Sequence, residues 1–132
     1  MTIDLKVLEQ SLETLLARDD TFPARFYQIL FERHPEVKKL FFRATPGAQR
    51  KMFAQKLCAI VDHVNDEEWL SRELSKLKKA HDDYGVTAEM YPYVGDALLT
   101  TIEEALGPDF TPEVERNWRE AYDSISALIL KG

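Results

Sequence analysis

Cysteines, long apolar runs and a signal peptide are scarce or missing in this sequence. Cys58 is the one cysteine among 132 residues, so neither an intramolecular disulfide nor a multi-cysteine metal site can form. No apolar run reaches the roughly 18 residues that a membrane-spanning helix needs. The N-terminus lacks the basic and apolar regions of a signal peptide. We therefore expect a cytoplasmic protein that does not cross a membrane.

Positive charge is also scarce. The chain has 17 Lys and Arg against 23 Asp and Glu, which gives a formal net charge of −6. Nucleic-acid binding needs a basic surplus to neutralise phosphates, and anionic membrane surfaces attract cations, so neither partner is expected. Hydrophobic residues make up 45% of the chain, which is typical of a folded domain rather than a disordered segment. The length suits one domain over residues 1–132.

Apolar residues recur at helical spacing along almost the whole chain. Thr45-Pro46 and Thr111-Pro112 predict helix starts, because threonine caps a helix and proline fits its first turn. No segment alternates like a strand, and no Asn-Gly or Asp-Gly hairpin turn is present. The pattern predicts an all-α domain, including helices over about 4–18 and 87–106. The first of these carries an apolar stripe of Leu5, Leu8, Leu12, Leu15 and Leu16.

His81 is the residue with the clearest chemical implication. It follows Leu74 by seven residues and Leu77 by four, and this spacing places all three on one face of a helix. Its imidazole is therefore expected to point inward. An inward histidine is either satisfied by a backbone carbonyl or serves as a metal ligand, because a neutral imidazole nitrogen suits haem iron. The spacing by itself leaves both interpretations open.

Segments on both sides of His81 resemble one known family. Residues 26–41, FYQILFERHPEVKKLF, are similar to the B helix and C corner of bacterial globins, where a Phe-Tyr pair precedes "HPE" and a turn ending in an aromatic residue. Residues 81–86, HDDYGV, and 91–99, YPYVGDALL, are similar to that family's proximal segment, and 118–122, WREAY, to its last helix. The matches follow in order over nearly the whole chain. It thus resembles the single-domain globins of the flavohaemoglobin type.

This resemblance implies a globin fold of about six to seven helices around one haem b. In it, His81 is the proximal iron ligand, and Phe41 packs against the haem from the corner. Tyr27 is the distal tyrosine, Gln49 faces the ligand, and Phe53 is the apolar neighbour one turn later. The remaining haem contacts that it implies are Val86, Tyr91, Val94 and Tyr122.

The distal helix admits two registers. Counting back from His81 places Gln49 and Phe53 at the two distal positions. Aligning the local Arg50-Lys51 pair with relatives places Ala48 and Met52 there instead. We favour the first register, because its spacing to His81 needs no gap.

The implied function is reversible binding of dioxygen and other diatomic gases, NO and CO. The outer oxygen of bound dioxygen carries partial negative charge, to which a phenolic O–H from Tyr27 and an amide N–H from Gln49 can both donate. Such donors favour tight retention over rapid transport. A haem-based gas sensor that acts through a protein partner is the alternative. An enzyme with its own acid–base pair is not expected, because the sequence has no nucleophile–histidine arrangement and no phosphate loop.

Two departures from flavohaemoglobins limit what the resemblance implies. Those proteins continue into flavin and nicotinamide domains, so nitric-oxide detoxification by this chain would need a separate reductase. They also place a glutamate late in the last helix, beside the proximal tyrosine and histidine, at a spacing that here falls beyond Gly132. We therefore expect ligand binding without strong peroxidase-like chemistry. Both a monomer and a homodimer are compatible with the sequence.

Overall fold

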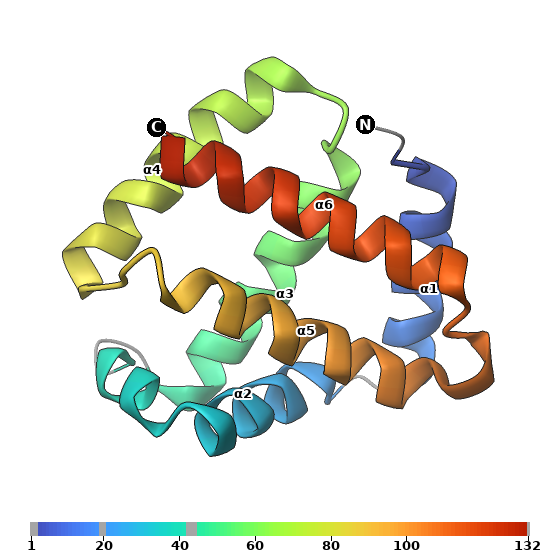
Figure 1. The fold of residues 1–132 in the computed structure, drawn as a ribbon, viewed down its shortest axis with the longest axis horizontal. Coiled ribbons are helices and arrows are strands. Elements are labelled where there is room, and N and C mark those ends of the chain that lie inside the picture. The colour runs from blue at the N-terminus through green and yellow to red at the C-terminus, as the bar shows by residue number, and fades with distance from the viewer. Residues whose placement is uncertain (1–2, 19–20, 42–44, 132) are drawn as a thin grey trace.

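The computed structural model describes residues 3–18, 21–41 and 45–131 (Figure 1). These residues form helices and no strand, so the all-α prediction is confirmed. No helix in these ranges is long and apolar enough to cross a membrane. In chain order the elements are α1 (Leu5–Arg18), α2 (Phe22–Arg33), the 3₁₀ helix η1 (Pro35–Leu40), α3 (Pro46–Asp62), α4 (Glu67–Tyr84), α5 (Met90–Leu106), the 3₁₀ helix η2 (Gly107–Asp109) and α6 (Pro112–Lys131).

Several helix ends follow from local chemistry. Thr45 and Thr111 cap α3 and α6, because each hydroxyl accepts a hydrogen bond of 3.2 Å from the backbone N–H three residues later. Gly85 ends α4 at a φ of 86°, a left-handed conformation that glycine adopts without strain. The expected helix from Thr87 instead begins at Met90. The backbone N–H of Met90 donates to the Thr87 carbonyl, which closes a tight turn ahead of the helix.

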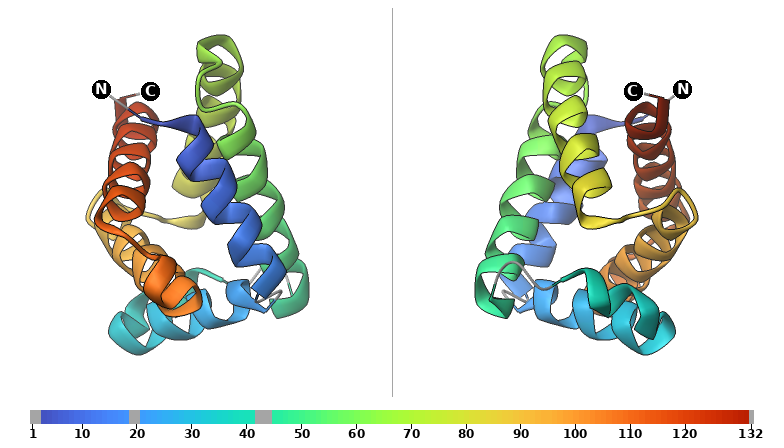
Figure 2. Two further views of the ribbon diagram at one scale, coloured as in Figure 1. Left: turned by 90° about the vertical axis from the view of Figure 1, so that its right-hand side faces the viewer. Right: turned by 90° about the vertical axis from the view of Figure 1, so that its left-hand side faces the viewer.

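The helices cross one another in an irregular arrangement rather than as an even bundle. α5 packs on α1, α2 and α6, while α3 packs on α1 and α2, and α4 packs on α6. Figure 2 shows that α3 and α4 meet at one end and diverge towards the other. The two helices that carry Gln49 and His81 therefore rest on different parts of the fold.

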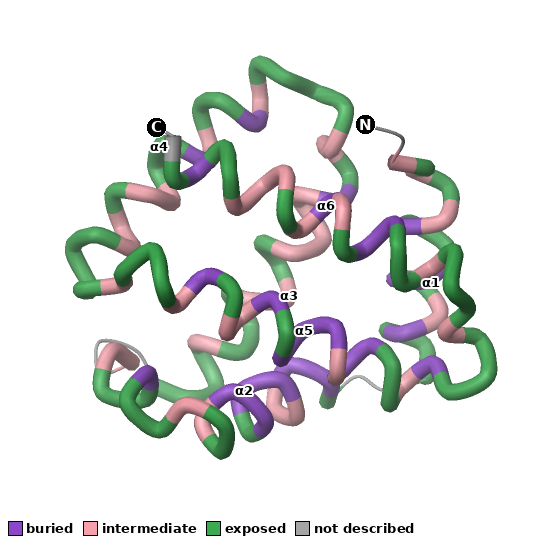
Figure 3. Tube along the Cα trace, viewed as in Figure 1, coloured by how far each residue is buried: buried purple, intermediate pink, exposed green. Residues whose placement is uncertain are grey.

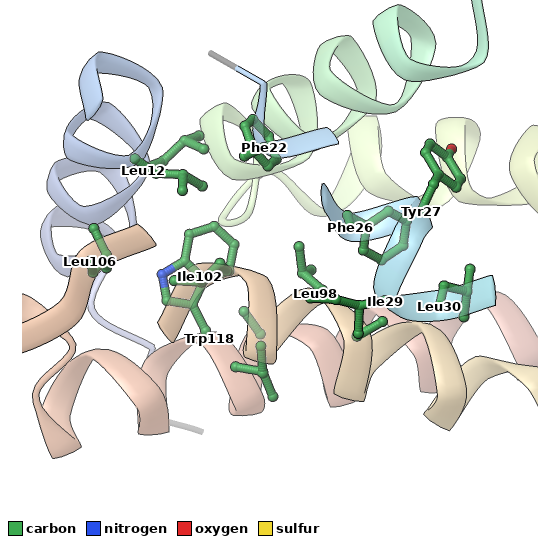
Figure 4. Close-up of a cluster of buried hydrophobic side chains, with 14 of the residues drawn as sticks. Leu12, Phe22, Phe26, Tyr27, Ile29, Leu30, Leu98, Ile102, Leu106 and Trp118 are labelled. Carbon is green, nitrogen blue, oxygen red and sulfur yellow. The ribbon is translucent and has the colours of Figure 1, made fainter. Parts of the chain in front are cut away.

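The apolar core consists of two separate clusters. The larger cluster joins α1, α2, α3, α5 and α6, and Figure 4 shows its centre (Phe22, Phe26, Ile102 and Trp118). The smaller cluster consists of Leu70, Leu74, Tyr91 and Ile129, with partly buried neighbours around it. Figure 3 shows the buried residues concentrated along α2 and α5, whereas α4 is mostly exposed or intermediate.

One leucine of the expected α1 stripe faces solvent. Leu8 and Leu15 are fully buried and Leu12 is 6% exposed, but Leu16 is 38% exposed. Leu16 directly follows Leu15, and consecutive helical residues lie about 100° apart around the axis. Leu16 therefore points about 100° away from Leu15, beyond the edge of the face that the core covers.

Candidate functional site

The distal side of the site is built on a contact between α2 and α3. The Gln49 amide nitrogen donates to the Tyr27 hydroxyl oxygen at 3.0 Å, although the two residues are 22 positions apart. Tyr27 is only 8% exposed. Ala48 is exposed and Met52 is 44% exposed. The structure thus brings Gln49 to Tyr27 and leaves the two residues of the other register exposed.

The contact with Gln49 leaves the hydroxyl hydrogen of Tyr27 available for another hydrogen bond. Because the Tyr27 oxygen accepts from Gln49, its own O–H is left to donate to another group. Burial raises the pKa of the Tyr27 phenol, and the hydrogen bond from Gln49 offsets this only in part. The phenol therefore stays protonated, and a donor, at any ordinary pH.

Aromatic rings pack against the Tyr27 ring. Phe41 lies edge-on to the Tyr27 ring with centroids 5.4 Å apart, and Phe53 lies edge-on at 5.7 Å. In Figure 4 the Tyr27 oxygen is turned away from Leu98 and Ile102, towards the edge of the cluster. The distal side therefore combines one directed O–H group with an apolar, water-excluding border.

The proximal side is built on a contact between α4 and α5. His81 Nδ1 lies 3.1 Å from the Tyr91 hydroxyl oxygen, and the two rings meet edge-on. The partner of His81 is thus a side chain and not a backbone carbonyl. In the part of the chain that the structure describes, Nε2 has no hydrogen-bond partner. Burial lowers the pKa of His81, against a smaller opposite effect of Asp82, which favours the neutral imidazole that ligates iron.

Tyr91 is itself held by a hydrogen bond from α6. The Tyr122 hydroxyl donates to the Tyr91 carbonyl oxygen at 2.5 Å. The Tyr122 ring lies so close to α5 that a Cβ on Gly95 would be 2.6 Å from it. Burial raises the pKa of Tyr122, so its hydroxyl remains a donor. Gly95 was not predicted as a site residue, although a glycine in the middle of an apolar helix is the usual sign of a close approach.

The other sequence-predicted residues line these two halves. Val94 is partly buried against the larger cluster, and Val86 is partly buried against the smaller one. The remaining histidines are engaged elsewhere: His34 stacks on Tyr93, and His63 stacks on Trp69. His81, by contrast, contacts Tyr91 of the smaller cluster.

These residues fit a haem better than a bare metal ion. Within the described ranges, no group of three or more His, Cys, Asp or Glu side chains could hold a metal. A porphyrin would supply the other ligands of an iron atom bound at His81. Partly buried apolar side chains border both clusters, and a flat apolar macrocycle could cover them. They are Phe41, Phe53 and Leu57 on the distal side, and Leu77 and Val86 on the proximal side.

Comparison with known proteins gives consistent matches. The model of the globin family matches residues 24–129. An uncharacterized globin-like protein of Aquifex aeolicus is 31% identical over 126 residues, which cover 96% of this chain and 88% of that protein. A solved structure of an engineered carbene transferase from Rhodothermus marinus, whose parent carries the name of a nitric oxide dioxygenase, superposes with a TM-score of 0.83. It is 30% identical, over 97% of this chain and 91% of that one.

Longer proteins match over the same region. A flavohemoprotein of Rhodopirellula baltica is 30% identical over 128 residues, which cover 96% of this chain but 31% of that protein. The chain therefore spans about a third of the length of the curated flavohemoproteins that it matches.

Proposed function

The chain belongs to the globin family, and on this premise we propose that residues 1–132 bind one haem b through His81 and take up a diatomic gas beside Tyr27. The observation that carries the proposal is a pair of hydrogen bonds, one to a residue of the larger cluster and one to a residue of the smaller cluster. Gln49 donates to Tyr27 on one side, and His81 meets Tyr91 on the other. Within the described residues, the first hydrogen bond leaves the Tyr27 O–H available to donate to a bound gas, and the second leaves His81 Nε2 available to ligate haem iron.

The chain's own residues have distinct tasks in this proposal. The haem, when bound, supplies the iron at which the gas ligates. Tyr91 orients the His81 ring through Nδ1, so that Nε2 is the nitrogen presented. Tyr27 donates its O–H to the gas, and Gln49 holds the Tyr27 oxygen in place. Phe41 and Phe53 exclude water, which strengthens that hydrogen bond by lowering the local dielectric.

Haem titration tests the proposal directly. We expect the purified chain to take up one haem, and the ferrous complex to shift its Soret band when carbon monoxide is added in the absence of air. The measurement is an absorption titration followed by dithionite reduction. A chain that is helical by circular dichroism yet takes up no stoichiometric haem would contradict the proposal.

The register of α3 gives a second prediction. We expect Gln49→Leu to speed dioxygen release about fivefold, which corresponds to about 1 kcal/mol for one lost hydrogen bond. Met52→Leu is the matched control and should change the rate by less than about twofold, because a surface substitution costs about 0.5 kcal/mol or less. Stopped-flow displacement of dioxygen by carbon monoxide measures both rates. A larger effect at Met52 would support the other register.

Nitric oxide chemistry is a second candidate function. The parent of the Rhodothermus marinus relative is named as a nitric oxide dioxygenase, and several relatives are named flavohemoproteins. Such turnover consumes electrons. We propose that a separate reductase supplies them to this chain.

A further inference from the structure

The distal side contains a stack of rings that the proposed function does not use. Phe26 and Phe53 lie parallel, with centroids 4.3 Å apart and an interplanar angle of 5°. Phe22 lies tilted against Phe53 at 6.3 Å. Phe22 is fully buried and Phe26 is 2% exposed, whereas Phe53 is only partly buried. Phe53, at the border of the site, thus packs against two core residues, Phe22 and Phe26.

This backing restricts how Phe53 can move. Protein interiors are close-packed, so the Phe53 ring cannot swing towards α2 without displacing Phe26 or Phe22. On its other side the ring meets Tyr27 edge-on at 5.7 Å. Phe53 also lies one helical turn after Gln49, whose amide reaches the Tyr27 hydroxyl. The Phe53 ring is therefore held against the Tyr27 ring, on the helix that carries Gln49.

From this arrangement we propose that Phe26 is a positioning residue that sets the size limit for ligands. It holds Phe53 beside Tyr27, so that the distal space admits diatomic gases and excludes ligands with an alkyl tail. The inference rests on the proposed function, because it concerns the space in which the gas binds. It assigns a role to Phe26, which is not itself among the residues that face the ligand.

Alkyl isocyanides provide the test, because they ligate ferrous haem as carbon monoxide does but carry a tail. The experiment compares the affinities of carbon monoxide and n-butyl isocyanide for the haem-loaded chain and for its Phe26→Leu variant. The variant should bind n-butyl isocyanide at least about tenfold more tightly and carbon monoxide within about threefold of the original affinity. A single methylene of fit in an apolar pocket is already worth about 10–200-fold.

Two further variants distinguish the positioning of Phe53 by Phe26 from a general loosening of the distal packing. Phe31→Leu is the matched control: it lies on the same helix, and its ring contacts Tyr27 and Phe41 rather than Phe53. It should leave the isocyanide affinity unchanged. Phe53→Leu should raise that affinity, and adding Phe26→Leu to it should have no further effect, because Phe26 acts through Phe53.

The outcomes are distinguishable. Equal effects of Phe26→Leu and Phe31→Leu, or additive effects of Phe26→Leu and Phe53→Leu, would overturn the role of Phe26 while leaving gas binding intact. Absence of haem uptake by the unaltered chain would overturn the proposed function and this inference together. Circular dichroism checks folding, and Phe26→Met, which removes the ring and keeps an apolar side chain, serves where Phe26→Leu does not fold.

Discussion

Replacement of His81 by glycine is expected to lower the affinity for haem by more than about 100-fold, because substitutions that only touch the partners of a metal ligand already cost about 10–100-fold. The glycine variant loses the ligand itself. Its other consequence is a vacancy beside Tyr91 of the size of an imidazole ring, since His81 and Tyr91 meet edge-on with centroids 5.7 Å apart. Added imidazole should therefore enter and restore much of the haem affinity. Absorption titration with and without imidazole measures both effects.

The other two histidines provide matched controls. His63 is engaged with the Ala59 carbonyl and the Trp69 ring, and His34 with the Tyr93 ring. His63→Gly and His34→Gly should take up haem like the unaltered chain. If either of them loses haem while His81→Gly retains it, the assignment of the proximal ligand is wrong.

Replacement of Tyr27 by phenylalanine should speed dioxygen release by about 10–30-fold, which corresponds to about 1.5–2 kcal/mol for a hydrogen bond to a partly charged acceptor. The effect exceeds that of Gln49→Leu, because Tyr27 carries the free O–H and Gln49 only holds its oxygen. Carbon monoxide, which is a much weaker acceptor, should leave at a nearly unchanged rate. Stopped-flow measurements of both gases separate loss of a hydrogen bond from loosening of the pocket.

The same measurement has a defined pH dependence. Burial raises the pKa of Tyr27 above its ordinary value of 10, so the O–H persists below that pH. The rate of dioxygen release should therefore be flat between pH 6 and 9. Tyr93→Phe, a matched change on α5, should leave the rate as it is. A rate that rises steeply across this range would contradict donation from a protonated Tyr27.

Local sequence was sufficient where local chemistry determines the structure. Thr45-Pro46 and Thr111-Pro112 predicted helix starts, and both threonines cap. Gly85 ends α4 in a left-handed conformation, which is likewise a local property. The spacing of His81 from Leu74 predicted an inward imidazole, and His81 is partly buried. These features depend on hydrogen bonds and side-chain directions within a few residues, which short segments encode.

Local sequence was insufficient where the partner of a residue lies on another helix. The α3 segment admits two registers, of which the spacing to His81 only favours one, and the hydrogen bond between Gln49 and Tyr27 joins residues 22 positions apart. The spacing of His81 left open whether its partner was a carbonyl, and the structure supplies the hydroxyl of Tyr91 from the next helix. Both contacts depend on how the helices cross, which short segments do not encode.

The sequence by itself determined an all-helical chain, several of its helix ends and, through resemblance, the globin family. Only the tertiary structure decided the backing of Phe53 by Phe26 and the brace of Tyr91 by Tyr122 across Gly95. The physical reason is the range of the interactions. Helix formation and capping are local, whereas ring stacking and buried hydrogen bonds between helices exist only once crossing angles and close packing have brought distant residues together.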